Sequence, residues 1–233
     1  MLDRNSHEVV MKNILKDFYS HRLLAVVLGF KGGTACYFFH KLPRFSVDLD
    51  FDLLHIKKAD EVFEIVKSIA EKYGTLEEAQ KKRNTLFYLL NYQATKQKIK
   101  IEISLRGKSD KFEIKNLYGF SVLTMVKEDM FANKLVAATE RKRTAHRDFY
   151  DINFFLKNSW DINEKIIKER TDKSLEEYLK FLIKYIEKNI TQKNILDGLG
   201  EVLDDAQKDS VKASLKSDLL FNLKLRLAGV ESF

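Results

Sequence analysis

The chain has 233 residues, of which 45% are hydrophobic and 32% charged, with 9 glycines and 1 proline. This length and composition exclude a disordered chain and one too short to bury a core, and the scarcity of glycine and proline favours helices. The only cysteine, Cys36, excludes an internal disulfide and a Cys/His zinc site.

The net charge of +7 is confined to the first two-thirds of the chain. Up to Ser159 there are 28 lysines and arginines against 20 acidic residues, and after it 13 against 14. The excess gathers in KKRN from Lys81, KQKIK from Lys96 and RKRTAHR from Arg141. Such stretches favour binding of a polyanion such as RNA, and the alternative is that they are ordinary solvated faces.

No segment predicts membrane insertion. The longest apolar run, residues 23–30, is far shorter than the ~20 residues of a membrane helix, and MLDRNSHEVV lacks the layout of a signal peptide. We therefore expect a cytoplasmic protein with no membrane partner.

Apolar spacing predicts the elements in chain order. The first is a helix over residues 9–19, followed by a buried strand in the run 23–30. A short helix over 34–42 ends before Pro43, and alternation over 46–54 predicts a strand. An amphipathic helix is expected over 59–73.

Two β-rich segments come next, over 85–92 and 98–105, and the polar residues 93–97 between them predict a hairpin. A further strand is expected over 117–123, and helical spacing dominates beyond Thr124. The fold class is therefore α+β. A small mixed sheet with helices forms a core over 1–123, and a helical region over 124–233 is expected to pack on it and contribute to the cleft.

The segment 46–54 carries aspartates at alternate positions, Asp48, Asp50 and Asp52. On a strand these side chains share one face, while the apolar residues between them point to the core. Crowded carboxylates repel one another unless a cation lies among them, and oxygen ligands suit Mg²⁺. The alternative is an exposed strand with acidic alternation.

Gly32 and Gly33 lie between a predicted strand and a predicted helix, where backbone N–H groups can bind a phosphate. Thr34 is a suitable N-cap and Lys31 adds positive charge. A tight turn without a function is the alternative. A phosphate-binding turn beside paired carboxylates is the minimum equipment for metal-assisted nucleotidyl transfer.

Three motifs together carry a family resemblance: KGGTACYFF, RFSVDLDFD and EDMFANKLVAATERKRTAHRDFYDI, spanning Lys31 to Asp151. The first two resemble the glycine turn and Asp-x-Asp of the nucleotidyltransferase superfamily. With the third, the chain is similar to AbiEii-type toxins, the nucleotidyltransferases of type IV toxin–antitoxin and abortive-infection systems.

The resemblance assigns roles to particular residues. It implies metal binding by Asp48, Asp50 and a third carboxylate from a later strand, for which strand phase offers Glu102. Candidate catalytic residues are Asp48, Asp50, Glu102, Lys134 and Asp148, and candidate nucleotide-binding residues are Lys31, Gly32, Gly33, Thr34, Arg44, Ser46, Lys134 and Asp151. Asp52 is expected to be accessory.

Each of the later assignments has a structural alternative. Glu102 is equally consistent with an exposed glutamate, Lys134 with a lysine that snorkels from an apolar stripe, and Asp151 with a surface pair to Arg147. In addition, Gly33 or Thr34 stands where the superfamily usually has serine.

The resemblance implies a Mg²⁺-dependent, two-metal transfer of a nucleotide monophosphate from an NTP to an RNA acceptor such as the tRNA 3′ end. It also implies a cognate antitoxin protein. Nucleotidylation of a small molecule and a catalytically silent nucleotide-binding module are the alternatives.

Overall fold

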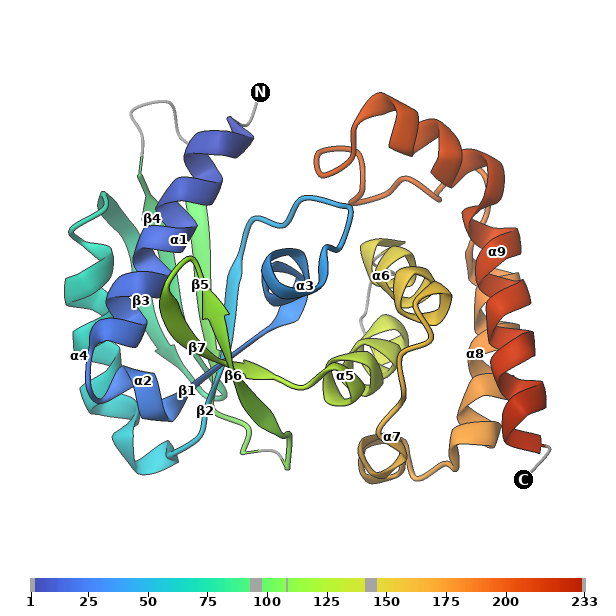
Figure 1. Ribbon diagram of the computed structural model, residues 1–233, viewed down its shortest axis with the longest axis horizontal. Helices are drawn as coiled ribbons and strands as arrows, with labels where there is room; N and C mark the ends of the chain where they lie inside the picture. Colours follow the sequence, from blue (N-terminus) through green and yellow to red (C-terminus); the bar gives the residue numbers. More distant parts are fainter. Residues whose placement is uncertain (1–2, 93–97, 108, 141–145, 232–233) are drawn as a thin grey trace. The chain divides into compact units, whose positions relative to one another are not determined.

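The computed structural model describes residues 3–92, 98–107, 109–140 and 146–231. The chain divides into two compact units, Met1–Met125 and Val126–Phe233. The first is a sheet with helices and the second is helical (Figure 1).

The first unit contains all the described strands. Its helical elements are α1 (Arg4–Ser20), α2 (Leu24–Val27), α3 (Gly32–His40), η1 (Ile56–Lys58) and α4 (Ala59–Ala70). Its strands are β1 (Leu28–Lys31), β2 (Leu49–Leu53), β3 (Thr75–Lys82), β4 (Thr85–Asn91), β5 (Lys98–Ser104), β6 (Phe112–Leu117) and β7 (Phe120–Met125).

The seven strands form one mixed sheet in the order β3-β4-β5-β2-β1-β7-β6. β2 lies at its centre, antiparallel to β1 and parallel to β5. The pair β1–β7 is also parallel, whereas β3–β4, β4–β5 and β6–β7 are antiparallel. Because the hairpins lie at the edges, the strands with alternating charge occupy the middle of the sheet.

One face of the sheet is apolar and packs under α1 and α4, while α3 lies on the other side (Figure 1). Strand alternation turns every second side chain towards this core. The buried residues are Leu28, Phe30, Leu49, Phe51, Ile99, Ile101 and Ile103 from the strands, with Met11, Ile14, Phe18, Val62 and Val66 from the helices. Rings of Phe30, Phe18 and Phe51 meet at 5.2–5.7 Å between centroids.

The element predictions fail in three places. The run 23–30 is not one strand, because its first half forms α2 before β1 begins at Leu28. The expected strand at 117–123 is a hairpin of β6 and β7, whose turn holds Tyr118 and Gly119 at positive φ. β3 was missed, because its charged sequence TLEEAQKK has an exposed edge position and little apolar alternation.

The second unit consists of α5 (Lys127–Glu140), α6 (His146–Lys157), α7 (Glu164–Thr171), α8 (Leu175–Asn189) and α9 (Asp205–Glu231). These helices agree with the helical spacing expected beyond Thr124. α8 begins with a capping box between Ser174 and Glu177. Its apolar stripe, with α6 and α9 alongside, buries Phe149, Phe155, Leu179 and Leu182.

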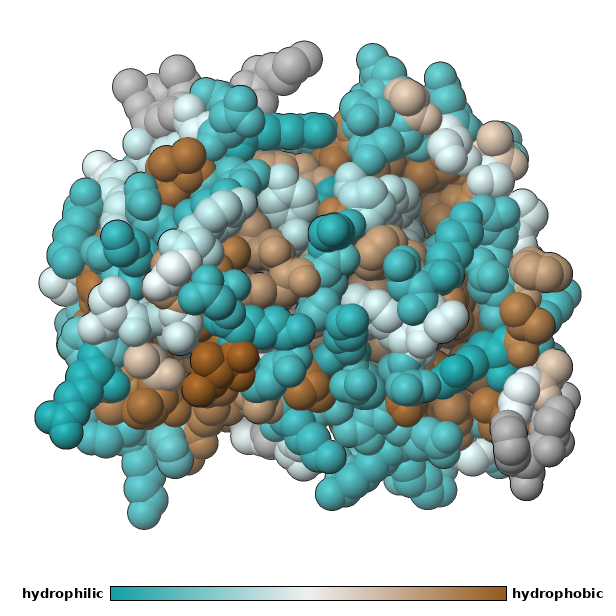
Figure 2. All heavy atoms as spheres, viewed as in Figure 1, coloured by the Kyte–Doolittle hydropathy of each residue, from teal (hydrophilic) through white to brown (hydrophobic). Residues whose placement is uncertain are grey.

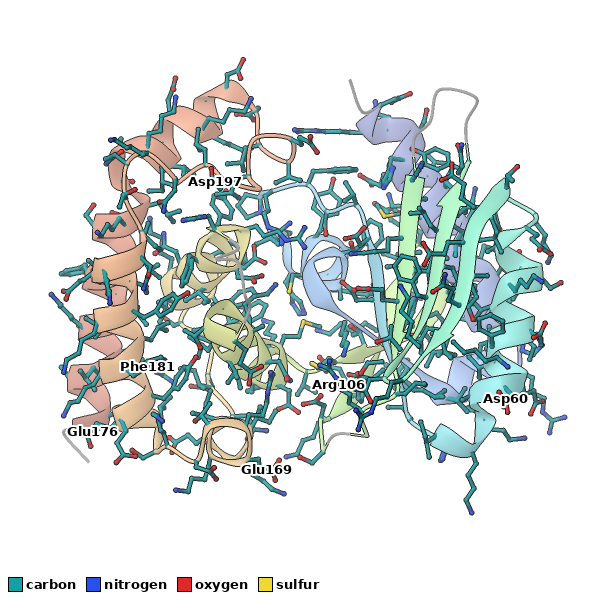
Figure 3. The ribbon with its side chains drawn as sticks, turned by 180° about the vertical axis from the view of Figure 1, so that it is seen from behind. Asp60, Arg106, Glu169, Glu176, Phe181 and Asp197 are labelled. Atoms are coloured by element: carbon teal, nitrogen blue, oxygen red, sulfur yellow. The ribbon has the colours of Figure 1, made fainter. Side chains whose placement is uncertain are left out.

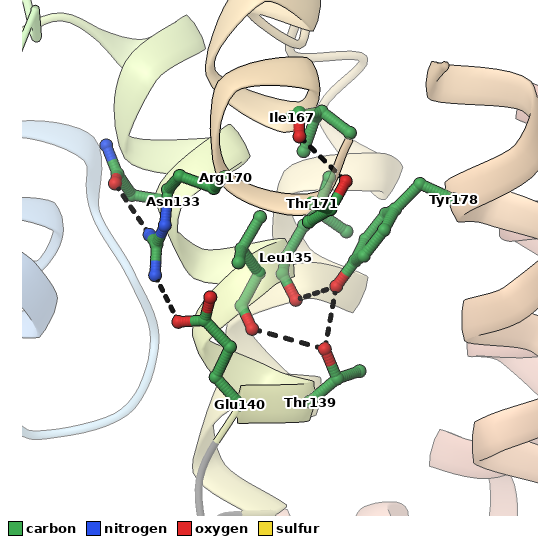
Figure 4. A network of polar contacts seen from close by, with 9 residues as sticks. Asn133, Leu135, Thr139, Glu140, Ile167, Arg170, Thr171 and Tyr178 are labelled. Carbon is green, nitrogen blue, oxygen red and sulfur yellow. Dashed lines mark hydrogen bonds and ion pairs between the residues drawn. The ribbon is translucent and has the colours of Figure 1, made fainter. Parts of the chain in front are cut away.

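A polar network fixes α5 to its neighbours (Figure 4). Arg170 of α7 donates to the Asn133 side-chain oxygen at 2.9 Å and pairs with Glu140. The Tyr178 hydroxyl of α8 donates to the Leu135 carbonyl at 2.8 Å. These contacts hold the backbone on both sides of residue 134.

Hydrophilic side chains cover most of the visible surface, with small hydrophobic groups between them (Figure 2). Scattered exposed apolar residues, such as Ile114 and Tyr118 of the β6–β7 hairpin, are normal for folded domains. Within the described ranges, no helix is long and apolar enough to cross a membrane.

Candidate active site

The register of three central strands assembles the candidate site in the first unit. Lys31 of β1 pairs with Asp50 of β2, and Asp50 pairs with Glu102 of β5. Directly paired residues point to the same face of a sheet, so these side chains lie opposite the apolar core. The strand phase predicted for Glu102 is thus the one observed, and α3 begins at Gly32 beside it.

Gly32 is required by its geometry. Its φ of +80° lies in the left-handed region, and a Cβ at this position would come within 2.6 Å of Asp50 Oδ2. The turn backbone therefore approaches the carboxylate as closely as a residue without a side chain allows. The N-cap of α3 is Lys31 and not Thr34 as predicted, because the helix starts two residues earlier.

Thr34, Arg44 and Ser46 are buried against the turn. The Thr34 hydroxyl donates to the backbone carbonyl of Asp48 and to Ser46 Oγ, the latter at 2.9 Å. A Cβ atom at Gly33 would lie only 2.7 Å from Arg44 Nη2. The fully buried Thr34 side chain holds the backbone at Asp48, directly before β2, and nucleotide contacts of Thr34, Arg44 and Ser46 remain predictions.

Asp50 carries the clearest electrostatic signature of the site. Burial, together with the neighbouring charges of Asp48 and Glu102, raises its pKa to about 6 from an ordinary 3.8. Burial disfavours the charged form, and like charges add to that effect. Strong pKa perturbation in a group of facing carboxylates is a mark of functional sites.

Lys100 is a site residue that sequence reasoning missed. Its ammonium lies 3.1 Å from Asp48 Oδ2 and 3.6 Å from Glu102 Oε2. Burial alone would lower the pKa of Lys100, but the nearby Asp48 and Glu102 outweigh it and raise the pKa above its ordinary value. The signal is present in the sequence, since residues 100 and 102 share a strand face, but position 100 also belongs to the basic stretch KQKIK.

Lys31, predicted to bind nucleotide, pairs with Asp52 in the structure. Asp52 is buried and lies across from Gly29, one step along the same face. Asp52 therefore supports the site indirectly, because its carboxylate binds the ammonium of Lys31, the N-cap residue of α3.

The donor chemistry of the three carboxylates fits a divalent cation that prefers oxygen, such as Mg²⁺. The raised pKa of Asp50 reflects burial first and then the negative charges of Asp48 and Glu102, which a cation would compensate. As placed, no three Asp, Glu, His or Cys side chains in the described part of the chain converge on a metal position. Lys100 supplies the compensating charge between Asp48 and Glu102.

A second cluster belongs to the helical unit. Lys134 of α5 lies 3.0 Å from Asp148 Oδ1 and 3.1 Å from Asp151 Oδ2, both on α6. The two carboxylates are buried and the lysine side chain is only 14% exposed. Neither structural alternative holds, because Lys134 does not snorkel to the surface and Asp151 is not a surface partner of Arg147.

Comparison with known proteins identifies the family of the chain. The model of the nucleotidyl transferase AbiEii toxin family, type IV toxin–antitoxin system, matches residues 13–226. The chain belongs to this family. No functionally curated protein matches it.

Two solved structures from Helicobacter pylori share the fold of this AbiEii family member. One, described as a candidate nucleotidyltransferase, has 23% identity and a TM-score of 0.65, covering 100% of this chain and 98% of the other. The second, JHP933, has 18% identity and a TM-score of 0.60, with the same coverage. Family membership makes the protein a toxin-type nucleotidyltransferase and implies an NTP substrate and an antitoxin partner.

Proposed function

We propose that this AbiEii protein transfers a nucleotide monophosphate from an NTP to an RNA acceptor such as the tRNA 3′ end, with Mg²⁺. The observation that carries the proposal is the pairing of Lys31, Asp50 and Glu102 across three strands, with the Gly32 turn against Asp50. This arrangement joins a phosphate-binding turn to a carboxylate face.

The residues of the first unit divide the work. Backbone N–H groups at the start of α3 bind the phosphates, and Lys31 offsets their charge. The acceptor hydroxyl attacks the α-phosphorus, the α–β anhydride bond breaks and pyrophosphate leaves. Glu102, 38% exposed against 20% for Asp48, is the carboxylate that an acceptor can reach and that takes up the hydroxyl proton.

Asp48, Asp50 and Glu102 would hold the metal, which supplies a lowered pKa for the acceptor hydroxyl and charge compensation for the leaving pyrophosphate. Thr34 contributes by fixing the Asp48 backbone. The two-metal form of the mechanism remains a prediction.

Net positive charge supports an RNA acceptor. The basic stretches contribute less free charge than expected, because Lys81 pairs with Asp60, Lys82 with Glu78 and Lys98 with Glu77. Residues 96–97 and 141–145 of the other stretches lie outside the described residues. Pairing leaves the net charge of +7 unchanged, so long-range attraction to RNA persists.

Lys134, Asp148 and Asp151 are proposed to act on the triphosphate. Their support is a buried ion-pair cluster between α5 and α6, with α5 held to α7 and α8 by a polar network. Buried lysines between two carboxylates also occur as purely structural groups.

The test is transfer of label from each α-labelled NTP into total tRNA, with Mg²⁺, by the wild type and by Asp50→Asn. Asp60→Asn is the matched control, since Asp60 lies at the start of α4 with a 90% exposed side chain (Figure 3). We expect the wild type and the control to label tRNA with one preferred nucleotide and Asp50→Asn to lose at least a hundredfold.

Other outcomes favour the alternatives. Pyrophosphate release that depends on an added small hydroxyl compound, without label in RNA, would replace the RNA acceptor by a small molecule. Nucleotide binding without pyrophosphate release under any condition would leave a catalytically silent binding module.

Growth arrest on expression, abolished by Asp50→Asn, would support a toxic nucleotidyltransferase activity in cells.

A further inference from the structure

Lys100 lies between two carboxylates of the candidate metal-binding face. Its ammonium is within 3.1 Å of Asp48 Oδ2 and 3.6 Å of Glu102 Oε2. These two residues are also the charged neighbours that raise the pKa of Asp50. The lysine therefore touches two of the candidate metal ligands and acts electrostatically on the third.

Strand geometry explains this position. β5 runs parallel to β2 and pairs Ile101 with Leu49 and Glu102 with Asp50. Lys100 is two residues before Glu102, so both project from the same face. A lysine at this point has little choice of partner, since the nearest side chains of opposite charge are the metal-ligand candidates.

The ammonium can nevertheless leave. The side chain of Lys100 is 31% exposed, and its four-carbon stem has several rotatable bonds. Lysine is a point charge with freely rotating donors, unlike the fork of arginine, so it holds carboxylates without locking their geometry.

We propose that Lys100 is an internal counter-ion that a divalent cation must displace to enter the site, so that Lys100 sets the metal affinity of the enzyme. It is a positioning residue that keeps Asp48 and Glu102 together before metal binds. The inference rests on the proposed metal dependence of the reaction.

The sign of the effect follows from electrostatics. An ammonium a few ångströms from the ligands both competes for their lone pairs and repels the incoming cation. Removal of the charge should therefore tighten metal binding, although it removes two ion pairs. A lysine with a purely structural role would not produce this result.

The test is Mn²⁺ binding without nucleotide, followed by the loss of the free-ion signal in electron paramagnetic resonance. Lys100→Met is compared with the wild type and with Lys98→Met. Lys98 is the matched control, because it stands on the same face of β5 but pairs with Glu77. We expect the dissociation constant to fall at least tenfold in Lys100→Met and to stay within twofold in Lys98→Met.

A charge-retaining variant separates charge from shape. Lys100→Arg should bind Mn²⁺ no more tightly than the wild type, and Lys100→Gln replaces the methionine variant if the latter does not fold by circular dichroism. Unchanged or weaker Mn²⁺ binding in the folded, uncharged variant overturns the inference alone. Absence of Mn²⁺ binding in all proteins, with tRNA labelling that persists in EDTA, overturns the metal-dependent reaction itself.

Discussion

The substitution Asp50→Asn should remove catalysis and at the same time stabilise the protein above neutral pH. In the folded state the pKa of Asp50 is about 6, against 3.8 for an ordinary aspartate, because the side chain is buried beside Asp48 and Glu102. The unfolded chain therefore ionises first as the pH rises. The free energy of unfolding of the wild type therefore falls as the pH rises from 4 to 6, and the asparagine variant avoids this decrease.

The magnitude follows from the shift. A difference of this size corresponds to about 3 kcal/mol at pH 7, at 1.36 kcal/mol per pKa unit. Asp50 keeps some contact with solvent, so we expect about 1–3 kcal/mol, or a rise of about 5 °C in the melting temperature. The gain should be small at pH 4, where Asp50 is protonated in the folded wild type and about half protonated in the unfolded chain.

The assay is calorimetric unfolding in EDTA at pH 4, 5, 6, 7 and 8, which can resolve transitions of the two units. Asp60→Asn is again the control, because its exposed side chain should give a difference independent of pH. A difference between Asp50→Asn and wild type that is the same at pH 4 and pH 8 would refute the electrostatic reasoning. Addition of Mg²⁺ should stabilise the wild type more than the variant.

Three further results are expected. Gly32→Ala should lower the free energy of unfolding by about 2 kcal/mol and abolish transfer activity, because φ is positive there and a Cβ would meet Asp50. Gly119→Ala, with φ +91° and open space around it, should lower the free energy of unfolding by only about 1 kcal/mol and keep activity. Lys134→Met should destabilise the second unit by about 3–5 kcal/mol in urea unfolding, since it strands two buried carboxylates; an unchanged midpoint would contradict the ion-pair geometry. Burial lowers the pKa of His7 below 6.5, so the unfolded chain is protonated first as the pH falls, and the free energy of unfolding decreases below about pH 6.5. His7→Gln should lack this part of the pH dependence. Equal pH dependence of unfolding in the wild type and the variant would argue against the reasoning.

The structure also shows hydrogen-bond partners for His7 that suit a neutral ring. Its Nε2 lies 2.9 Å from the Val47 carbonyl oxygen, and its Nδ1 lies 2.8 Å from the Tyr92 hydroxyl. A neutral ring satisfies both partners, donating to the carbonyl and accepting from the hydroxyl. The α1 helix is thereby tied to the segment that leads into β2.

Much of the first unit was encoded in local pattern. Alternation in LDFDL and KIKIEIS determined which face of β2 and β5 carries charge, since side chains on a strand alternate whatever its neighbours are. The spacing of apolar residues likewise determined α1, α4 and α8. The glycine turn was readable because few residues other than glycine accept that backbone conformation.

Which charged side chains pair across neighbouring strands was decided only by the tertiary structure. The sequence showed lysines at positions 31 and 100, but strand pairing decided that one holds Asp52 and the other holds Asp48. It also decided that the Thr34 hydroxyl donates to the backbone carbonyl of Asp48, directly before β2. Periodicity describes a single element and its faces, whereas the neighbour of a charge depends on strand order and register, which long-range packing sets.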